Sequence, residues 1–572
     1  MSKQLATFIK EPKSLFLGLI AVYFLVVMHY FQHNYGGSGL DLPINPLGWI
    51  IMSGLIALGL IQIIRTQSFI FNRYLIILSS CCGLLLIPLL YSGAEAIHSY
   101  SRLLGLFTGL LVLVAFYQMQ FNRKDQRKIL WCILLAAFLE SLFALLQFYL
   151  LPHIPFLEMN IARPSAIFFQ ANVAATFFAT GLMISLYLSH SLPKHANKFT
   201  RIILIVAPFT LIISIVLLQS RTGFLGCIIG LIIWLCVNRS MPKKWLMIVI
   251  TGMVIAISSM HLLSSAIRDA NIYTQDSIRT SIYIDSFDSI KRAPLLGHGY
   301  GSFGYTFREQ QALNFQKNSN SPQVYNLNHP HNELLLWTVE GGLVSLIPLI
   351  IILISSALLF RRNLSTLKLL SVIFPISLHL FTEYPFYHSV ASYLTFILLL
   401  GLIATANDQS SNIQSKVLKK VLRFNNPKFI YGLIGLSIAA NTFVMFNLLS
   451  GQNMLTNSMR EQKIDNILES DYFFMSADFE LVLNEAVLNL AISHNIPIGA
   501  TAYNDWVITQ IHSYPRKRHF LNLYKSYQYL NDSKLAQETL NKAKYLFPTF
   551  DWSLDKDGNL HSPKKLTIND NQ

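Results

Sequence analysis

Charge and cysteine are both scarce in this sequence of 572 residues. Asp, Glu, Lys and Arg make up only 13% of it, against about a quarter in an ordinary soluble protein, and 53% is hydrophobic. The two long polar regions, 265–333 and 450–572, contain no cysteine, which excludes disulfides and cysteine-based metal sites there. The five cysteines lie in apolar stretches, where we interpret them as buried small side chains: Cys81, Cys82, Cys132, Cys227 and Cys236.

In place of charge, the first four-fifths of the chain holds a series of long apolar runs. A helix needs about 20 apolar residues to cross the hydrocarbon core of a bilayer. We identify thirteen runs near this length, at about 14–32, 47–64, 74–92, 103–119, 129–151, 171–189, 202–218, 222–237, 245–264, 334–360, 369–383, 387–406 and 429–449. No cleavable signal peptide is expected, because no small-residue cleavage site follows the long first run. The sequence therefore predicts an all-α polytopic integral membrane protein with about 13 transmembrane helices.

Basic residues are distributed unevenly between the two sets of loops. The N-terminus and every second loop are rich in Lys and Arg, near 65–73, 123–128, 194–201, 239–244, 361–368 and 416–428. The short loops of the other set hold only Arg102, Arg163 and Arg221. The positive-inside rule therefore predicts a cytoplasmic N-terminus and, after thirteen crossings, a C-terminus outside. Because the net charge of +15 is spread over the cytoplasmic loops, we expect no nucleic-acid partner.

Four short motifs place polar residues at the predicted outer boundary of the membrane: "ARPSAIFFQAN", "LLQSRTGFLG", "NHPHN" and "HLFTEYPFYH". A charged group at this boundary costs less than at the bilayer centre, but it still favours a partner or an anion. The residues concerned are Arg163, Gln170, Asn172, Arg221, His329, His331, Asn332, His379, Glu383, Tyr384 and His388.

Each of these residues also has a simpler interpretation. An arginine in an outer turn can extend toward lipid phosphates, and a histidine near a helix start is more often an interfacial residue than a catalyst. The pattern "HPH" is compatible with metal ligands, but a catalytic zinc site needs about three protein ligands, and no second pair follows. We therefore expect no metal and no other cofactor. The convergence of Arg163, Arg221, His331 and Glu383 on one face favours a functional site.

The long outer loop also contains a helical pattern. Ile278, Ile282, Tyr283, Phe287 and Ile290 recur at helical spacing, which predicts an amphipathic helix lying on the membrane interface. A proline at 294 is expected to end this helix, and "GHGYGSFGY" predicts a flexible glycine-rich loop over a site. No strand precedes these glycines, so they do not form a nucleotide-binding fingerprint.

The motifs resemble a known family. "HPHNELLLWTVEGGLVS", preceded by "APLLGHGYGSF", is similar to the Wzy_C domain of the O-antigen ligase and polymerase superfamily, and "LLQSRTG" is similar to its Ser-Arg-x-Gly turn. "RPSAIFFQANVAATF" and the Glu-Tyr-Pro of "HLFTEYPFYH" resemble bacterial protein O-oligosaccharyltransferases of the PglL-like, pilin-glycosylating type. The resemblance covers about 160–405. The chain departs from the pattern at 166–169, where a glycine-rich turn is commoner, and at Pro330 between the histidines.

The resemblance implies a GT-C-like membrane enzyme divided into five parts. These are N-terminal transmembrane helices (1–160), a transmembrane core with outer arginine turns (161–265), a periplasmic catalytic loop (266–333), C-terminal transmembrane helices (334–449) and a periplasmic helical domain (450–572). The Wzy_C-like part covers about 205–360. The implied location is the bacterial inner membrane, with the active site and C-terminus in the periplasm.

The resemblance further implies transfer of a glycan from an undecaprenyl-pyrophosphate donor to Ser or Thr hydroxyls of a pilin or another periplasmic protein. His331 would assist the acceptor hydroxyl, because a histidine pKa near ~6.5 suits proton transfer at neutral pH. Arginines suit pyrophosphate oxygens. The implied donor-binding residues are Arg163, Arg221 and Arg279; Arg221 and Glu383 join His331 as catalytic candidates, and Gln170, Asn172, His329, Asn332 and Tyr384 position substrate.

Other interpretations remain open at this point. Acceptor choice is not legible in the motifs, so an O-antigen ligase acting on lipid A–core, or a polymerase, is an alternative. Glu140 within an apolar run is a candidate proton relay of a transporter, or a structural hydrogen-bonding group. The predicted helical tail contains "YLNDSKLAQETLNKAKYLFPTF", similar to one tetratricopeptide-like unit, and either binds the acceptor protein or only covers the catalytic loop.

Overall fold

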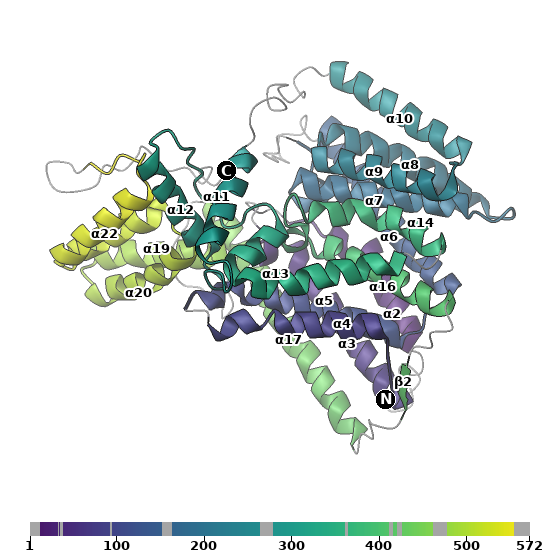
Figure 1. Cartoon of the computed structure of the whole chain (residues 1–572), viewed down its shortest axis with the longest axis horizontal. Helices are drawn as coiled ribbons and strands as arrows, with labels where there is room; N and C mark the ends of the chain where they lie inside the picture. The colour runs from purple at the N-terminus through teal and green to yellow at the C-terminus, as the bar shows by residue number, and fades with distance from the viewer. Residues whose placement is uncertain are drawn as a thin grey trace. The chain divides into compact units, whose positions relative to one another are not determined.

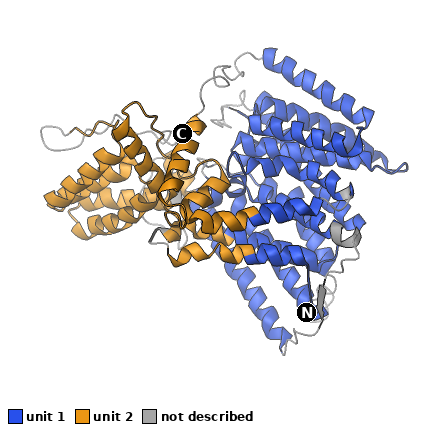
Figure 2. Ribbon diagram, viewed as in Figure 1, with its two compact units in different colours: residues 1–80, 105–270, 351–453 blue, residues 81–104, 271–350, 454–572 orange. Residues whose placement is uncertain are grey.

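The structure is a computed structural model that describes residues 12–32, 34, 38–91, 94–150, 163–262, 278–360, 364–410, 416–419, 426–461 and 477–553. Basic residues before Pro12, at 361–362 and at 420–425, which contributed to the predicted orientation, lie outside these ranges. The chain divides into two compact units, residues 1–80, 105–270 and 351–453 and residues 81–104, 271–350 and 454–572 (Figure 2). We call them the membrane unit and the loop–tail unit.

The membrane unit is a bundle of apolar helices (Figure 1). Side-chain caps begin several of them; Asn122 and Asp125, for example, form a reciprocal capping box at the start of α6. The helices are α2 (Pro12–Leu25), α3 (Ile44–Thr66), α6 (Arg123–Tyr149), α7 (Ala171–His190), α8 (Lys198–Leu217), α9 (Arg221–Asn238), α10 (Lys243–Leu262), α14 (Leu364–His379), α15 (Pro385–His388) and α16 (Val390–Ser410), with the short helices η1 (Val27–His29), η2 (Gly39–Asp41) and η7 (Ala166–Phe168). Residues of α4 (Arg73–Leu84), α5 (Tyr100–Gln118), α13 (Glu333–Leu359) and α17 (Pro427–Glu461) belong to both units.

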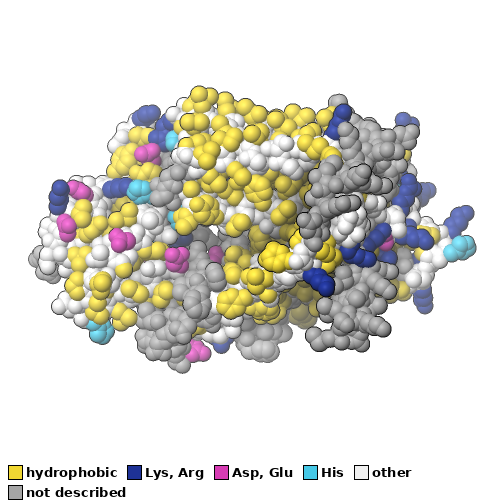
Figure 3. All heavy atoms as spheres, turned by 90° about the horizontal axis from the view of Figure 1, so that it is seen from below, with side chains coloured by type: hydrophobic (Ala, Val, Ile, Leu, Met, Phe, Trp, Pro, Cys, Tyr) yellow, Lys and Arg dark blue, Asp and Glu magenta, His cyan; other side chains and the backbone are white. Residues whose placement is uncertain are grey.

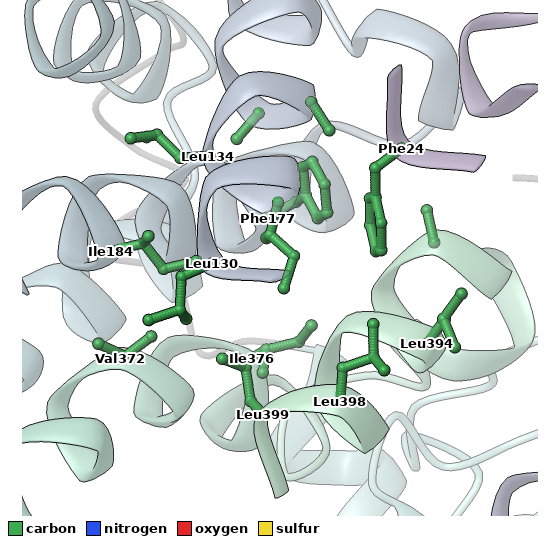
Figure 4. Packing of buried hydrophobic residues seen from close by; sticks show 14 of the residues in the cluster. Phe24, Leu130, Leu134, Phe177, Ile184, Val372, Ile376, Leu394, Leu398 and Leu399 are labelled. Carbon is green, nitrogen blue, oxygen red and sulfur yellow. The ribbon is translucent and has the colours of Figure 1, made fainter. Parts of the chain in front are cut away.

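Helix α7 lies at the centre of the membrane unit and packs against α6, α8, α9 and α14. Small residues allow these helices to approach closely, as is common between membrane helices. A Cβ atom added at Gly181 would lie 2.5 Å from the Ala137 side chain, and one at Gly223 would lie 2.6 Å from Ala175. Figure 4 shows the buried apolar side chains between the helices: Phe24, Leu130, Leu134, Phe177, Ile184, Val372, Ile376, Leu394, Leu398 and Leu399.

The outward side of many helices is apolar, as a lipid environment requires. Met247 and Val254 of α10, for example, are 67% and 57% exposed, and Figure 3 shows broad areas of hydrophobic side chains in which charged groups are sparse. Within the described ranges, 11 helices are long and apolar enough to cross a membrane. Two shorter apolar helices, Thr366–His379 and Val390–Ala406, account for the remaining predicted runs. The prediction of an all-α polytopic membrane protein is confirmed.

One small pair of strands departs from this helical pattern. Strand β1 (Ser68–Phe71) pairs antiparallel with β2 (Lys416–Lys419), with Ser68 opposite Lys419. The side-chain amide of Gln118 on α5 accepts from the backbone NH of Ile70 at 2.9 Å and donates to its carbonyl at 3.0 Å. The pairing connects two loops that the sequence assigns to the cytoplasmic side.

The loop–tail unit contains the long polar loop and the C-terminal tail. Its elements are η3 (Ile87–Leu90), η4 (Ala94–Ser99), α11 (Ile278–Arg292), α12 (Phe303–Lys317), the first part of α13, α19 (Ala477–Ser493), α20 (Pro497–Ser513), α21 (Lys517–Tyr529) and α22 (Ser533–Leu546). Residues 266–277, 462–476 and 554–572 of the predicted loop and tail lie outside the described chain.

The predicted amphipathic helix is present as α11. Ile282 is 2% exposed and packs in a small core with Phe303, Phe307, Leu336 and Val339 of α12 and α13. The same buried side holds polar residues, since the side-chain amides of Gln311 and Asn314 donate to the Asp285 carboxylate at 3.0 and 2.8 Å. The opposite side exposes two large apolar residues, Ile284 and Phe287, and Ile278 is exposed at the start of the helix. An exposed apolar side agrees with the interfacial location predicted for α11.

The glycine-rich stretch differs from the prediction of a flexible loop. The backbone NH groups of His298 and Gly299 donate to the carbonyls of Val339 and Glu340 at 3.0 and 2.8 Å. A Cβ atom at Gly297, whose φ is +73°, would lie 2.5 Å from the Glu340 backbone. The stretch therefore packs directly on α13. Its last residues begin α12, a helix within the region that was predicted to be a loop. Three closely spaced glycines obscured the start of that helix.

Helix α13 is interrupted at Gly342, where the backbone is left-handed (φ 58°, ψ −151°). A Cβ atom at this position would lie 2.4 Å from the Leu295 carbonyl oxygen, so only glycine fits. Residues 335–342 are all buried, whereas Leu343 and Ile347 beyond the interruption are 40% and 53% exposed. The part of α13 before the interruption is therefore enclosed by protein, and the part after it exposes an apolar side.

The tail is helical, as predicted, and consists of two helix pairs, α19–α20 and α21–α22, joined by contacts between α20 and α21. Its core contains Tyr503, Phe520, Phe547 and Trp552, each at most 4% exposed. Tyr305 and Tyr325 of the long loop pack against the same core. The tail and the loop therefore share one hydrophobic core within their unit.

Two buried groups give the tail opposite responses to pH. Burial, with the nearby Arg516 and Arg518, lowers the pKa of His519 from 6.5 to about 3. Burial raises the pKa of Glu485 from 4.5 to about 7, although the Arg518 guanidinium opposes this shift. His519 therefore contributes stability above pH 6.5 that is lost as the pH falls toward 3. Glu485 contributes stability below pH 4.5 that is lost as the pH rises toward 7.

Between these limits the two contributions cancel, so the wild-type tail is expected to have nearly constant stability from pH 4.5 to 6.5. In His519→Gln only the Glu485 effect is left, so the free energy of unfolding should fall as the pH rises. In Glu485→Gln only the His519 effect is left, so it should fall as the pH drops. Each slope is about 1.4 kcal/mol per pH unit. Hydrogen exchange of α21 in the full-length protein, corrected for intrinsic rates, measures both slopes. Lys534→Met, at an exposed position of α22, is the control. If the stability of His519→Gln and that of Glu485→Gln changed with pH in the same direction, the opposite pKa shifts assigned to His519 and Glu485 would be contradicted.

Candidate active site

Three of the four sequence motifs meet at Glu383 in the membrane unit. The Asn172 side-chain amide donates to Glu383 Oε1 at 2.8 Å, and the Gln170 amide donates to Glu383 Oε2. Gln170 and Asn172 stand at the start of α7, where the Gln170 side chain also caps the helix by accepting from Val173 NH at 3.1 Å. Glu383 follows α14 and is only 4% exposed. The Gln-x-Asn and Glu-Tyr-Pro motifs are therefore parts of one structure.

His379 completes the surroundings of this carboxylate. Its Nε2 lies 3.7 Å from Glu383 Oε2, and its Nδ1 is 2.8 Å from the Thr176 hydroxyl. Burial alone raises the pKa of Glu383, but His379 and the hydrogen bonds from Gln170 and Asn172 outweigh it and hold that pKa below its usual range. Glu383 is therefore a carboxylate over the whole physiological pH range, with donors directed at both oxygens.

The Ser-Arg-x-Gly motif joins the same network. The Ser220 hydroxyl donates to Asn172 Oδ1 at 2.8 Å and caps α9 by accepting from Gly223 NH at 3.2 Å. Arg221 is the first residue of α9 and is exposed. The Arg163 guanidinium donates to the Leu218 carbonyl at 3.3 Å, on the approach to the same turn. Two of the predicted phosphate-binding arginines are therefore associated with one turn, whose position depends on Asn172 and hence on Glu383.

Buried polar groups of α6 hold the neighbouring turn at 166–169. Ala166 and Phe169 have left-handed backbones, with φ of 51° and 54°, which side chains rarely adopt. Gln147 accepts from the backbone NH of Ala166 at 2.8 Å. Glu140 accepts from Ile167 NH at 3.0 Å and lies 2.6 Å from His29 Nδ1. These contacts explain how the chain keeps the turn without the commoner glycines, and they favour the structural interpretation of Glu140 over a proton relay.

The remaining predicted residue of this unit is Tyr384. Its ring lies 4.6 Å from the His388 ring and 5.6 Å from the Tyr387 ring, measured between centroids. The His388 carbonyl accepts from the Asn45 amide at 3.0 Å, which ties the Glu-Tyr-Pro turn to α3. Tyr384 is half-buried and stands directly after Glu383, so it belongs to the same turn.

The histidine motif lies in the loop–tail unit. The rings of His329 and His331 are 4.5 Å apart, and His329 Nδ1 lies 2.6 Å from Asn328 Oδ1. His331 has a left-handed backbone (φ 52°), and its carbonyl accepts from the Tyr283 hydroxyl at 3.4 Å. Both histidines are half-buried. The two rings on either side of the proline at 330 therefore lie next to each other.

Asn332 has a clear structural role. Its side-chain oxygen accepts from Leu335 NH at 3.1 Å, which caps the start of α13. An asparagine cap is worth about 1 kcal/mol relative to alanine, and aspartate or serine caps equally well. We predict that Asn332→Asp keeps the thermal stability of the detergent-solubilised protein while Asn332→Ala lowers it. If Asn332→Asp also keeps activity, capping accounts for this residue; an inactive but stable Asn332→Asp would assign it to substrate.

The other arginines outside the membrane unit have different surroundings. Arg279 is the second residue of α11 and is half-buried. Arg102 forms a buried ion pair with Glu340, and its guanidinium carbon lies 4.4 Å and 5.0 Å from the ring centroids of Trp337 and Tyr300. Arg102 therefore does not extend toward lipid. Glu340 also accepts from the backbone NH of Phe303 at 3.1 Å, at the start of α12.

The structure thus brings the predicted residues together in two groups. Gln170, Asn172, Arg163, Arg221, Glu383 and Tyr384 belong to the membrane unit, and Arg279, His329, His331 and Asn332 belong to the loop–tail unit. Ser220 and Glu340 were not predicted as site residues, and His379 was predicted only as one of the polar residues at the membrane boundary. Ser220 carried an N-cap signal, and Glu340 carried the same signal as Glu140, an acidic residue in an apolar run. Within the described ranges, no group of three or more His, Cys, Asp or Glu is arranged to hold a metal ion.

Comparison with known proteins agrees with this multi-pass helical architecture. Residues 206–350 match the Wzy_C family, described as O-antigen ligase. Residues 367–557 match a family described as the C-terminal part of a virulence-factor membrane-bound polymerase. An uncharacterized protein of Haemophilus influenzae is 28% identical over 294 residues, which cover 48% of this chain and 68% of that protein.

The fold and the site define a polytopic membrane protein with its polar motifs gathered at helix ends. The matches at 206–350 and 367–557 support a relationship to the Wzy_C superfamily, whose members are glycosyltransferase-like ligases and polymerases of the membrane.

Proposed function

We propose that this chain is a PglL-like protein O-oligosaccharyltransferase of a bacterial inner membrane. It transfers a glycan from undecaprenyl pyrophosphate to Ser or Thr hydroxyls of a pilin or another periplasmic protein. The observation that supports this most is the network in which Glu383 of the Glu-Tyr-Pro motif accepts from Gln170 and Asn172, and Asn172 accepts from Ser220 beside Arg221. The Glu-Tyr-Pro and Gln-x-Asn motifs are those that resemble the protein-glycosylating branch.

The chemistry requires cations where the leaving group gains charge. In the proposed reaction the acceptor oxygen forms a bond to the anomeric carbon, the bond from that carbon to the pyrophosphate oxygen breaks, and the hydroxyl proton passes to His331. Arg221 and Arg163 bind the pyrophosphate, aided by the N-terminus of α9, and Arg279 is a further candidate. Direct displacement inverts the anomeric centre. Such electrostatic stabilisation is usually the largest catalytic contribution, at about 3 kcal/mol for one donor.

We propose more specific roles for the polar residues of the membrane unit from their contacts. The side chains of Gln170 and Asn172 bind Glu383 and Ser220, so we assign them to holding the Arg221 turn rather than to contacting sugar. Glu383 acts through the same turn. Tyr384, half-buried beside it, remains a candidate for substrate contact. His329 lies next to His331 and is the matched control for its proposed catalytic role.

The second candidate is an O-antigen ligase or a polymerase. The names of the two matching families support it, because one is described as a ligase and the other as a polymerase. All three activities use a lipid-linked glycan and differ in the acceptor hydroxyl, which belongs to a protein, to lipid A–core or to another lipid-linked glycan. The product that carries the glycan therefore decides between them.

The test is glycan transfer in cells that lack their own ligase and are supplied with a lipid-linked glycan and candidate acceptors. Wild type is compared with His331→Ala, His329→Ala and Arg221→Ala at matched membrane levels. Glycan on a protein that disappears with His331→Ala and Arg221→Ala but survives His329→Ala is the expected result. Glycan only on lipopolysaccharide, or only on longer lipid-linked chains, would reassign the acceptor. Transfer by all three variants would contradict the mechanism.

A further inference from the structure

The segment that carries the two histidines is short and is fixed at both ends. Residues 326–331, here called the histidine segment, contain no helix or strand. On the C-terminal side, the segment ends at Asn332, which caps α13. On the N-terminal side, it begins directly after Tyr325. The position of the histidine rings therefore depends on how firmly Tyr325 and its neighbours are held.

On one side, residues 323–325 are held by α12. The Gln311 side-chain oxygen accepts from Val324 NH at 3.1 Å, and Arg308 donates to the Val324 carbonyl at 3.2 Å. Arg308 is only 4% exposed, and burial lowers its pKa to about 10. Val324 and Leu327 pack against the small core of α11, α12 and α13. These contacts come from the long loop itself.

On the other side, Tyr325 is held by the tail. Its hydroxyl forms a hydrogen bond with Thr549, and its ring stacks on Phe547 with 5.8 Å between centroids and 28° between planes. The Lys517 ammonium lies 4.1 Å from the centroid of the Tyr325 ring, at the start of α21. A cation this close to an aromatic face is attracted to it electrostatically, so Lys517 helps to hold the ring in place. Tyr325 therefore packs against the core of the tail, although it lies four positions before His329.

We infer that the tail is a positioning element of the active site, which acts through Tyr325 to hold the histidine segment in its productive place. This inference rests on the proposed function, in which His331 assists the acceptor hydroxyl. Val324 and Leu327 face the loop core while Tyr325 faces the tail core, so the segment lies between two cores of one unit. Removing the tail contact takes away one of the two sets of contacts described above, and the contacts with α11, α12 and α13 stay.

A tail that positions the histidine segment and a tail that binds the acceptor protein would affect different kinetic constants. Misplacement of a catalytic group lowers kcat, because the bound reactants no longer reach the right geometry. Loss of an acceptor-binding surface raises the KM for a whole acceptor protein and leaves transfer to a short peptide unchanged. The kinetic constants for the two acceptors therefore distinguish the roles.

The experiment uses full-length Tyr325→Leu, Lys517→Met and Lys517→Arg variants, with the exposed-position variant Lys534→Met as control. Transfer is measured on the protein that wild type glycosylates and on a short peptide containing its acceptor site. Tyr325→Leu and Lys517→Met are expected to lower kcat by about ten- to a hundredfold on both acceptors with unchanged KM. Lys517→Arg, which keeps the cation, should recover most of the rate, and Lys534→Met should match wild type. A higher KM for the whole protein alone would overturn the inference.

Hydrogen exchange provides a second measurement that does not require transfer. Tyr325→Leu and Lys517→Met are expected to increase exchange in residues 326–331 and to leave α19 and α20 protected. Unchanged exchange in 326–331, or loss of protection throughout the tail, would overturn the inference. If these residues exchange faster but no variant, including His331→Ala, changes transfer, the positioning effect stands and the proposed function fails.

Discussion

Replacement of Glu383 by glutamine is expected to remove most glycan transfer, although the side chain keeps its shape. Gln170, Asn172 and His379 surround the Glu383 carboxylate, and the two amides donate to it. A glutamine would present an NH2 group to one of these donors, and each buried donor left without an acceptor costs about 1–3 kcal/mol. The turn that carries Ser220 and Arg221 would then shift, with a loss of about a hundredfold in transfer rate.

The network also offers a rescue. In the double variant Gln170→Glu/Glu383→Gln, the carboxylate and the amide exchange places, and the residue at 170 still accepts from Val173 NH. Transfer by the double variant is expected to exceed that of Glu383→Gln several-fold, measured in membranes at matched protein levels. Glu538→Gln, on the exposed side of α22, is the control. A Glu383→Gln variant as active as wild type would show that the network does not shape the site.

Replacement of Arg102 by methionine is expected to have the largest effect on stability. Arg102 and Glu340 are 8% and 3% exposed, and removing one partner of a buried ion pair costs about 3–5 kcal/mol, because the other charge stays buried alone. Glu340 also binds the backbone NH of Phe303, so the start of α12 should loosen as well. Thermal unfolding of the detergent-solubilised protein and hydrogen exchange of residues 297–317 measure the two effects.

Two further variants test this explanation. Arg102→Met/Glu340→Gln is expected to recover much of the loss, because the neutral amide oxygen still accepts from Phe303 and position 340 no longer carries a buried charge without its partner. Lys291→Met breaks the exposed pair between Lys291 and Asp288 and should change stability little. Equal losses for Arg102→Met and Lys291→Met would show that burial of the Arg102–Glu340 pair is not the cause.

The spanning helices were predictable because lipid and apolar residues impose a simple pattern over about 20 residues. The amphipathic helix α11 was predictable for the same reason, since five apolar residues recur at helical spacing. Helix α12 was not predicted because its apolar side is short and three closely spaced glycines come just before its start. Contacts with α11 and α13 stabilise this helix, and these contacts cannot be recognised in the sequence.

The candidate site was only partly predictable. The motifs identified Gln170, Asn172, Arg221 and Glu383 as important, but not that the first two bind the last. Glu140 and Glu340 carry the same sequence signal, and both prove to hold neighbouring backbone, at Ile167 and Phe303. Partners this distant along the chain are set by tertiary packing. Which polar residues bind each other was therefore harder to predict than which polar residues belong to the site.

The interruption of α13 at Gly342 has a consequence for topology mapping. The helix has 27 residues, about 40 Å at 1.5 Å each, whereas the hydrocarbon core is about 30 Å thick. Most of its residues before Gly342 are apolar because they face other protein, not lipid. A hydropathy profile therefore starts the membrane-spanning part of this helix about two turns before its true beginning. Cysteines introduced at 335–339 should react with neither aqueous maleimide nor a lipid-soluble reagent, and the first labelled positions should follow Gly342.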